Sequence, residues 1–336
     1  MGKATINAAV YDTHGNPAEV LRVQTQPWPI CGPDEVTVAM RAAPINPADL
    51  NQIEGKYPIR SPLPATPGFE GAGVVVETGP EARHVSTGAH VILPHNLGTW
   101  REACAVKATE LVVVPSEIDL VQAAMLKINP LTAWRLLHGY VELKRENWVI
   151  QNAANSAAGR AVIQIARELG IKTVNVVRRE ELVEELRVLG GDVVLIDGEA
   201  LRDNVKESTG GAPIHLGLNA VGGDSALRLM NCLAPGGTLV TYGAMSLQPL
   251  KVPNGLLIFK DLRFRGIWIN KWYDNATMAE RTEAFQQLFD MVKRGLLKTK
   301  VDRAYPLTEA KAAVTHAAQG KRSGKIIFEF NSPGDA

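Results

Sequence analysis

Short runs in which hydrophobic and polar residues alternate dominate residues 1–121, and Pro and Gly recur between them. The clearest runs are 35–46, 72–79 and 89–95. Alternation with a period of two places every second side chain on one face of a strand, and Gly and Pro mark the turns between strands. This part of the chain is therefore predicted to form an irregular, mostly β domain.

From residue 122 onward, strand-like apolar runs are separated by segments with helical periodicity. These runs are 148–153, 173–178, 192–197, 215–221, 237–243 and 262–269. Repeated βα units of this kind are typical of a parallel, doubly wound sheet with helices on both faces. The second part of the chain is thus predicted to be an α/β domain.

Periodicity also predicts individual elements of this second part. Val162, Ile165 and Leu169 follow the spacing of one helix face, and Gly170 is the expected end of that helix. A second helix-like stretch covers 276–294. An alternating strand near the end of the chain is expected to rejoin the first domain.

The turn after the first of the six strands has the strand–turn–helix order of a dinucleotide site. Its sequence, AANSAAG (153–159), keeps only Gly159 of the G-x-G-x-x-G pattern, with alanines as small substitutes. Asn155 and Ser156 can hydrogen-bond phosphate, and the helix N-terminus offers free N–H groups. An ordinary βα turn with an Asn or Ser cap is the alternative. The surrounding six-strand pattern favours the dinucleotide site.

The residues after the second strand indicate which dinucleotide is bound. NAD sites usually place Asp or Glu there for the ribose hydroxyls, whereas this chain has Arg178 and Arg179. A pair of guanidinium groups suits a 2′-phosphate by charge and by donor geometry. Two solvated arginines at the start of a helix are the alternative, and Glu180 lies close by. We expect NADPH.

Composition narrows the class of protein. Lys plus Arg is 36 against 35 Asp plus Glu, so the net charge of +1 leaves no basic excess for nucleic acid. The first residues lack the apolar core of a signal peptide, and no apolar run approaches the roughly 18–20 residues that span a bilayer. We therefore expect a cytoplasmic protein without a membrane partner, or a mature chain whose targeting segment has been left out.

Metal ligands are sparse in the sequence. Three cysteines, at 31, 104 and 232, lie far apart, and the loop 46–58 has none. In the segment PGFEG, Phe69 stands where zinc dehydrogenases of this plan carry histidine. His84, His90 and His95 have neither helical ligand spacing nor a nearby cysteine pair. We expect no metal.

Several motifs, taken in order, resemble those of the zinc-free medium-chain dehydrogenase/reductase superfamily, and within it the trans-2-enoyl-CoA/ACP reductases. They are INPADLNQIEGKYP, LGTWREACAV, INPLTAWRLL, IQNAANSAAGRAVIQIA, NVVRRE, TYGAM and LLIFKDLRFRGIWINKW. The resemblance covers nearly the whole chain. It implies a GroES-like, mostly β catalytic domain at 1–121, a Rossmann NADPH-binding domain at 122–270, and a return to the catalytic domain at 271–336.

The resemblance also implies roles for individual residues. Tyr57 would be the catalytic residue. The NADPH site would comprise Asn129, Asn155, Ser156, Ala157, Ala158, Arg178, Arg179, Glu180, Tyr242, Gly243, Ala244, Met245, Ile267, Trp268, Ile269 and Lys325. Ala157, Ala158 and Glu180 depart from the residues usual in the family, which bears on cofactor affinity.

The expected reaction transfers hydride from NADPH to C3 of an enoyl thioester of CoA or acyl carrier protein, while C2 takes a proton. Tyr57, with an ordinary pKa near 10, is neutral at pH 7 and can supply this proton. A half-buried loop aromatic before Pro58 is the structural alternative for Tyr57. The competing functions are a zinc-free NADPH:quinone oxidoreductase and a catalytically idle NADPH-binding protein. The resemblance also implies a homodimer, with the strand RFRGIWI as a candidate pairing edge.

Overall fold

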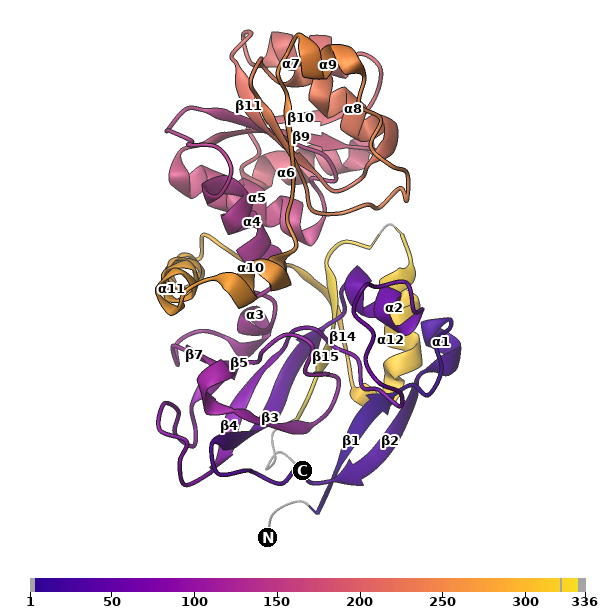
Figure 1. Ribbon diagram of the computed structural model, residues 1–336, viewed down its shortest axis with the longest axis vertical. Helices are drawn as coiled ribbons and strands as arrows, with labels where there is room; N and C mark the ends of the chain where they lie inside the picture. The colour runs from indigo at the N-terminus through magenta and orange to yellow at the C-terminus, as the bar shows by residue number, and fades with distance from the viewer. Residues whose placement is uncertain (1–3, 321, 332–336) are drawn as a thin grey trace. The chain divides into compact units, whose positions relative to one another are not determined.

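The computed structural model describes residues 4–320 and 322–331, and the chain divides into two compact units. Unit 1 comprises residues 1–128 and 299–336, and unit 2 comprises residues 129–298. Residues 1–3, 321 and 332–336, which the expected first and third segments include, lie outside the described residues. Figure 1 shows the elements of both units along the chain.

The unit boundaries differ from the expected 121/122 and 270/271 for reasons of packing. Helix α3 (Leu120–Ala124) contacts strands β3 and β4 of unit 1, which carries the chain past residue 122 before it leaves that unit. Helix α11 (Met278–Lys293) packs on α4 (Asn129–His138) of unit 2. The Arg294–Glu168 ion pair, 2.7 Å, adds a contact within unit 2. Such contacts between distant segments leave no local signal in the sequence.

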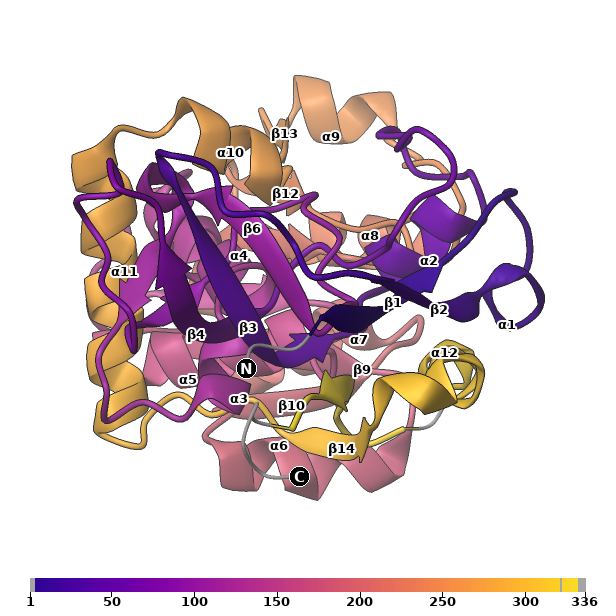
Figure 2. The same ribbon diagram turned by 90° about the horizontal axis from the view of Figure 1, so that it is seen from below.

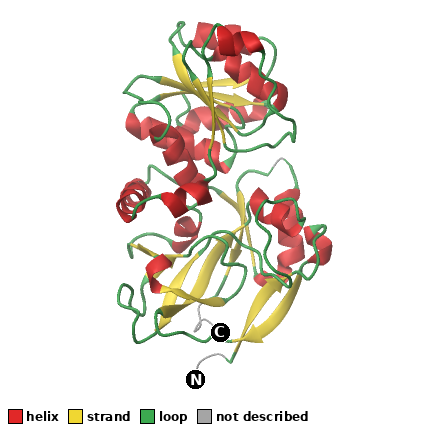
Figure 3. Cartoon of the chain, in the orientation of Figure 1, coloured by secondary structure: helices red, strands yellow, loops and turns green. Residues whose placement is uncertain are grey.

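Unit 2 is a doubly wound α/β domain, as the strand and helix pattern predicts. Its six parallel strands lie in the order β10-β9-β8-β11-β12-β13. Their bounds are β8 Trp148–Gln151, β9 Lys172–Val177, β10 Val193–Ile196, β11 Ile214–Asn219, β12 Thr238–Thr241 and β13 Arg263–Gly266. Each lies within or beside one predicted run. In Figure 3 these strands lie between layers of helix.

Helices cover both faces of this sheet, with α4, α5 and α6 on one side and α7 and α8 on the other (Figure 1). The remaining bounds in unit 2 are α5 Ala157–Leu169, η2 Glu180–Leu182, α6 Val183–Leu189, α7 Leu201–Ser208, α8 Gly223–Cys232, α9 Asn254–Ile258 and α10 Ile269–Asn275. Alternate residues of β9 face the two helical layers. Val174 and Val176 pack with Leu201 of α7, and Val177 packs with Ile163 of α5.

Helix α5 has the expected ends, and α11 lies within the predicted stretch 276–294. Ser156 caps α5, and Gly170 follows it with a left-handed φ of 69° that few other residues adopt without strain. Helix α11 begins after Thr277, whose hydroxyl accepts a hydrogen bond from the Glu280 N–H while the Glu280 carboxylate accepts one from the Thr277 N–H. This reciprocal cap satisfies two N–H groups that a helix terminus leaves unpaired.

Unit 1 is mostly β, as expected. One sheet has the order β14-β15-β3-β4-β5-β7, with β6 also paired to β3, and β1 and β2 form a separate pair. Strand β15 pairs antiparallel with β3, so the end of the chain lies in the same sheet as its first part. The strands are β1 Thr5–Val10, β2 Arg22–Pro27, β3 Glu35–Pro44, β4 Ala72–Thr78, β5 His90–Ile92, β6 Ala103–Lys107, β7 Val112–Val114, β14 Val301–Tyr305 and β15 Lys325–Glu329.

Short helices complete unit 1. They are α1 Pro17–Val20, α2 Pro47–Ile53, η1 Ala108–Glu110, η3 Leu307–Glu309 and α12 Ala310–Ala318. In Figure 2, α1 and α12 lie near each other, and the two helices are in contact. The unit has its own core, in which Trp100 packs edge-on against Phe328 of β15 at 5.0 Å between ring centroids. This core is the support on which α2 and the loop after it are built.

Candidate active site

The residues expected to bind the nucleotide gather at one edge of the sheet in unit 2. Because all six strands are parallel, their carboxyl ends meet at the same edge. Four groups of expected residues come after strands there: 178–180 directly after β9, 242–245 directly after β12, 267–269 directly after β13, and 155–158 in the turn after β8 and the start of α5. The carboxyl edge of such a sheet is where ligands bind in open α/β folds.

The turn between β8 and α5 is capped by a serine and packs closely on the helix. Ser156 Oγ accepts the N–H of Gly159 at 3.1 Å, so the serine acts as the helix cap. A Cβ on Gly159 would lie 2.6 Å from the Ala154 carbonyl oxygen and 2.7 Å from its Cα. The helix therefore packs too closely on the turn for any larger residue. This explains why Gly159 alone survives from the glycine pattern.

Ala153 occupies a backbone conformation that normally favours glycine. Its φ is 48°, in the left-handed region, at the turn that immediately follows β8. A residue with a Cβ is strained there by about 1–2 kcal/mol. The alanine substitution noted in the sequence is thus accommodated at the cost of local strain.

Replacing Ala153 by glycine is expected to leave the free energy of unfolding unchanged or to raise it by up to about 1 kcal/mol, since relief of strain opposes the greater chain entropy of glycine. Urea unfolding followed by circular dichroism measures the change. The neighbouring Ala154 is a matched control, because it is fully buried and its φ is not in the left-handed region. Ala154→Gly should lower the free energy of unfolding, and an equal loss in both variants would contradict this account.

Tyr242 and Ser156, from two different loops, lie next to each other. Burial raises the pKa of Tyr242 to about 12, and the Ser156 side chain beside it opposes the rise. The buried hydroxyl makes no well-formed hydrogen bond to any residue within 4–320 and 322–331. A buried donor without a partner is costly in a finished structure. A phosphate or ribose bound at this edge of the sheet could hydrogen-bond to the Tyr242 hydroxyl.

The two arginines lie directly after the last residue of β9. Arg178 is exposed, and Arg179 is half-buried and forms an ion pair with Glu181 at 3.0 Å. Glu180 is exposed and begins the short helix η2. Exposed ion pairs contribute little, so Arg179 can exchange its partner for a phosphate at small cost. The two guanidinium groups at the end of β9 therefore suit a 2′-phosphate.

The remaining expected nucleotide residues fall into two groups. Gly243 packs against the end of β11, where a Cβ would lie 3.0 Å from the Ala220 carbonyl oxygen, while Ala244 and Met245 are exposed. Ile267, Trp268 and Ile269 run from β13 into α10. Asn129 is the first residue of α4 in unit 2. Lys325 alone lies in unit 1, on β15.

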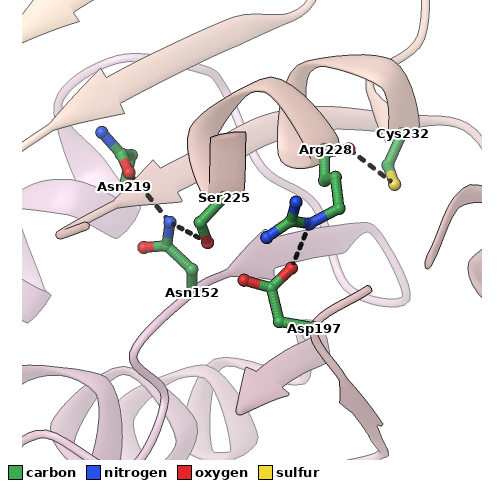
Figure 4. A network of polar contacts seen from close by, with 6 residues as sticks. All are labelled: Asn152, Asp197, Asn219, Ser225, Arg228 and Cys232. Carbon is green, nitrogen blue, oxygen red and sulfur yellow. Dashed lines mark hydrogen bonds and ion pairs between the residues drawn. The ribbon is translucent and has the colours of Figure 1, made fainter. Parts of the chain in front are cut away.

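A buried amide network, which the sequence pattern did not predict, lies at the carboxyl edge of the sheet (Figure 4). Asn152 Nδ2 donates to Asn219 Oδ1 at 2.8 Å and to Ser225 Oγ at 3.2 Å. Asn152 Oδ1 in turn accepts the N–H of Ala220 at 2.7 Å, and Asn219 Oδ1 accepts the N–H of Gly222 at 3.0 Å. These bonds hold the ends of β8 and β11 in register with the loop after β11. The sequence does contain a signal for this network, because the amide residues Asn152 and Asn219 stand at the ends of otherwise apolar strand runs.

A second contact in the same figure fixes helix α8. Arg228 Nε donates to Asp197 Oδ1 at 2.5 Å, and Asp197 follows β10. The hydrogen bond to Asp197 raises the pKa of Arg228. Cys232 Sγ donates to the Arg228 carbonyl oxygen at 3.2 Å, one turn along the helix. The ion pair thus ties α8 to the end of β10.

Tyr57 lies in unit 1, in the loop that follows α2. The side chain is half-buried, and its ring packs against that of Phe69 with 5.1 Å between centroids and 55° between planes. Its backbone N–H donates to the Asn51 carbonyl oxygen at 3.1 Å. Phe69, in the position that zinc enzymes give to a metal ligand, thus serves here as a packing surface for Tyr57.

A cluster of buried charged residues lies next to Phe69. Asp49 and Glu70 are fully buried, and Lys325 is 5% exposed. Lys325 Nζ donates to the Ile45 carbonyl oxygen at 3.0 Å and to Asn46 Oδ1 at 2.5 Å. Burial lowers the pKa of Lys325 and raises that of Glu70, while their opposite charges counteract both shifts. An ammonium group has three donors, so one remains beyond these two hydrogen bonds.

The described residues offer little to a metal ion. Within residues 4–320 and 322–331, no group of three or more His, Cys, Asp and Glu side chains could hold a metal. Across the same residues, no helix has the length and apolar character needed to span a membrane.

The chain is similar to known proteins in both sequence and structure. Two family models match: "Alcohol dehydrogenase GroES-like domain" at residues 32–116 and "Zinc-binding dehydrogenase" at residues 189–328. A mitochondrial enoyl-acyl-carrier-protein reductase from Caenorhabditis elegans is 44% identical over 88% of this chain and 87% of its own length.

Solved structures are similar over nearly the full length. The Etr1p/NADP/crotonyl-CoA complex has a TM-score of 0.89 and 29% identity, covering 98% of this chain and 100% of that one. A putative NADPH:quinone reductase from Bacillus thuringiensis has a TM-score of 0.90 and 30% identity at the same coverage. The expected α/β fold class is confirmed. From the identity and coverage of the enoyl reductase relative, we conclude that the chain belongs to the enoyl-acyl-carrier-protein reductase family of medium-chain dehydrogenases/reductases.

Proposed function

We propose that this protein reduces the 2,3 double bond of trans-2-enoyl thioesters with NADPH, placing hydride on C3 and a proton on C2. The observation that carries the proposal is the 44% identity to an enoyl-acyl-carrier-protein reductase over 88% of the chain. The similar structure of the Etr1p/NADP/crotonyl-CoA complex supports the same cofactor and substrate class. The thioester carrier is CoA or acyl carrier protein.

The carboxyl edge of the unit 2 sheet would hold the cofactor. The N-terminus of α5 and Ser156 suit the pyrophosphate, Arg178 and Arg179 suit the 2′-phosphate, and the Tyr242 hydroxyl beside Ser156 suits a further polar group. Residues 243–245, 267–269 and Asn129 complete the proposed site within unit 2, and the family resemblance adds Lys325 of unit 1. Bound NADPH supplies the hydride.

Tyr57 would hold the proton that the product gains. Hydride addition at C3 leaves negative charge on the thioester oxygen and C2, and a neutral phenol can donate a hydrogen bond or a proton to either. Proton donation by a positioned side chain contributes typically about 10²–10⁴ in rate. The ring contact with Phe69 and the backbone bond to Asn51 support this role, because they hold the side chain in one place.

Quinone reduction is the second candidate function. It is favoured by the likeness to the putative NADPH:quinone reductase, which matches the fold as well as the enoyl reductase complex does. Following NADPH oxidation with a short enoyl-CoA, a long enoyl-CoA and a quinone in parallel separates the two functions. We expect fast turnover of at least one enoyl-CoA. Turnover of quinone alone would overturn the proposal, and no turnover of any substrate would support an idle NADPH-binding protein.

We also propose a homodimer formed through unit 2. Strand β13 is the edge of its sheet, and the nearby Ile258 and Phe259 are 69% and 83% exposed. An unpaired edge beside exposed apolar side chains is suited to pairing with its own copy across a two-fold axis. Light scattering at micromolar concentration should give twice the monomer mass, and a monomer would contradict the proposal.

The relatives are named mitochondrial, whereas the cytoplasmic location stays a prediction from the sequence.

A further inference from the structure

The buried carboxylate of Asp49 connects the two segments that hold Tyr57, and Glu70, beside Phe69, adds a bond by accepting Asn46 Nδ2 at 2.8 Å. Asp49 is the third residue of α2 and is fully buried. Its Oδ2 accepts the N–H of Asn46, just before α2, at 2.7 Å. Its Oδ1 accepts the N–H of Phe69, in the segment that leads into β4, at 2.8 Å. The two oxygens of one side chain thus fasten α2 to the backbone of Phe69.

Tyr57 is attached to the same two segments. Its backbone N–H bonds to Asn51 of α2, and the adjacent Lys56 N–H bonds to the same carbonyl oxygen at 2.8 Å. Its ring packs on that of Phe69, which is 1% exposed and therefore cannot shift freely. The backbone of Tyr57 depends on α2 and its ring depends on Phe69. Asp49 is part of the first support, α2, and is hydrogen-bonded to the second, Phe69.

We propose that Asp49 is a positioning residue for Tyr57, setting the distance between α2 and Phe69 and so the place of the phenol. The inference rests on the proposed function of Tyr57 as proton donor. Asp49 lies in the interior, so it acts on the reaction only through the side chain it holds in place. A displacement of about 1 Å in a catalytic group can cost on the order of 10²-fold in rate.

The geometry requires a carboxylate rather than any polar group of the same shape. Two N–H donors point at the two oxygens, and an ionised carboxylate only accepts hydrogen bonds. Asparagine has one acceptor oxygen, so its NH₂ group would face one of the two backbone N–H groups. Burial raises the pKa of Asp49, and the Asn46 N–H, Lys325 and the Phe69 N–H oppose the rise. Lys325 supplies the counter-charge.

Asp49→Asn is therefore the direct test. We expect kcat with an enoyl-CoA to fall by about 10–100-fold while KM changes little, because binding surfaces are kept and only the donor is displaced. Asp119→Asn is the matched control in unit 1. Asp119 also accepts two backbone N–H groups, those of Val121 and Gln122, but at the exposed start of α3. This control should leave kcat unchanged.

A double-mutant cycle separates positioning from a general structural role. If Asp49 acts through the Tyr57 hydroxyl, Asp49→Asn should change kcat by less than about 2-fold once Tyr57→Phe is present. An equal loss of kcat in both backgrounds would overturn the proposal. If Asp49→Asn does not fold, Asp49→Glu takes its place, because it keeps two acceptor oxygens but changes their reach to the N–H groups of Asn46 and Phe69.

A readout independent of activity completes the test. The chain has six tyrosines, so 3-fluorotyrosine labelling gives few ¹⁹F signals, and Tyr57→Phe identifies that of Tyr57. Asp49→Asn or Asp49→Glu should shift or broaden the Tyr57 signal, and Asp119→Asn should not. An unmoved signal would overturn the positioning role whatever the enzyme reduces. A moved signal without enoyl reduction by the native protein would instead refute the proposed function.

Discussion

Tyr57→Phe is expected to lower turnover of an enoyl-CoA by about 10²–10⁴-fold, the usual contribution of a positioned proton donor. Phenylalanine keeps the ring that packs on Phe69 at 5.1 Å and the backbone N–H that bonds to Asn51, so the loop should keep its conformation. The dissociation constant of NADPH, measured by fluorescence titration, should not change. The loss of turnover would then be due to removal of the hydroxyl alone.

Tyr11→Phe is a matched control for this experiment. Tyr11 is fully buried in unit 1, and its hydroxyl has no hydrogen-bond partner within residues 4–320 and 322–331. Removing an unsatisfied buried hydroxyl is neutral or stabilising, so turnover should remain that of the native protein. Unchanged turnover in Tyr57→Phe would remove Tyr57 from the mechanism. Equal losses in both variants would indicate a general disturbance of unit 1.

Local patterns in the sequence were enough to predict the sheet of unit 2. Each of its strands lies within or beside a predicted apolar run, and α5 has both of its predicted ends, with Ser156 before it and Gly170 after it. Caps and periodicity arise from residues close together in the chain. They can therefore be read without knowledge of the tertiary structure.

Features that depend on distant segments could not be predicted in this way. The unit boundaries differ from the predicted ones because α3 packs on β3 and β4, and α11 packs on α4. The charges of Asp49 and Lys325 are 276 positions apart in the sequence (325 − 49), and each alone resembles an ordinary surface charge. Only the pairing of β15 with β3 brings them together in the interior. The support of Tyr57 is thus a property of the fold.

The arginine pair after β9 gives the second large expected effect. Replacing both Arg178 and Arg179 by glutamine should weaken NADPH binding by about 10²-fold or more, since each hydrogen bond to a charged group contributes roughly 1.5–3 kcal/mol. NADH lacks the 2′-phosphate, so its dissociation constant should change little. Fluorescence titration with both nucleotides therefore reports on this one group.

Arg187→Gln supplies the control for lost positive charge. Arg187 lies on α6, on the surface of the same unit, in an exposed ion pair with Glu184 at 3.9 Å. Long-range charge effects would weaken NADPH binding in this variant too, whereas direct phosphate binding predicts no change. Equal weakening of NADPH and NADH by the double substitution would contradict a 2′-phosphate site. Tighter binding of NADH than of NADPH by the native protein would overturn the cofactor assignment, because the exposed Arg178 would then have no phosphate to bind.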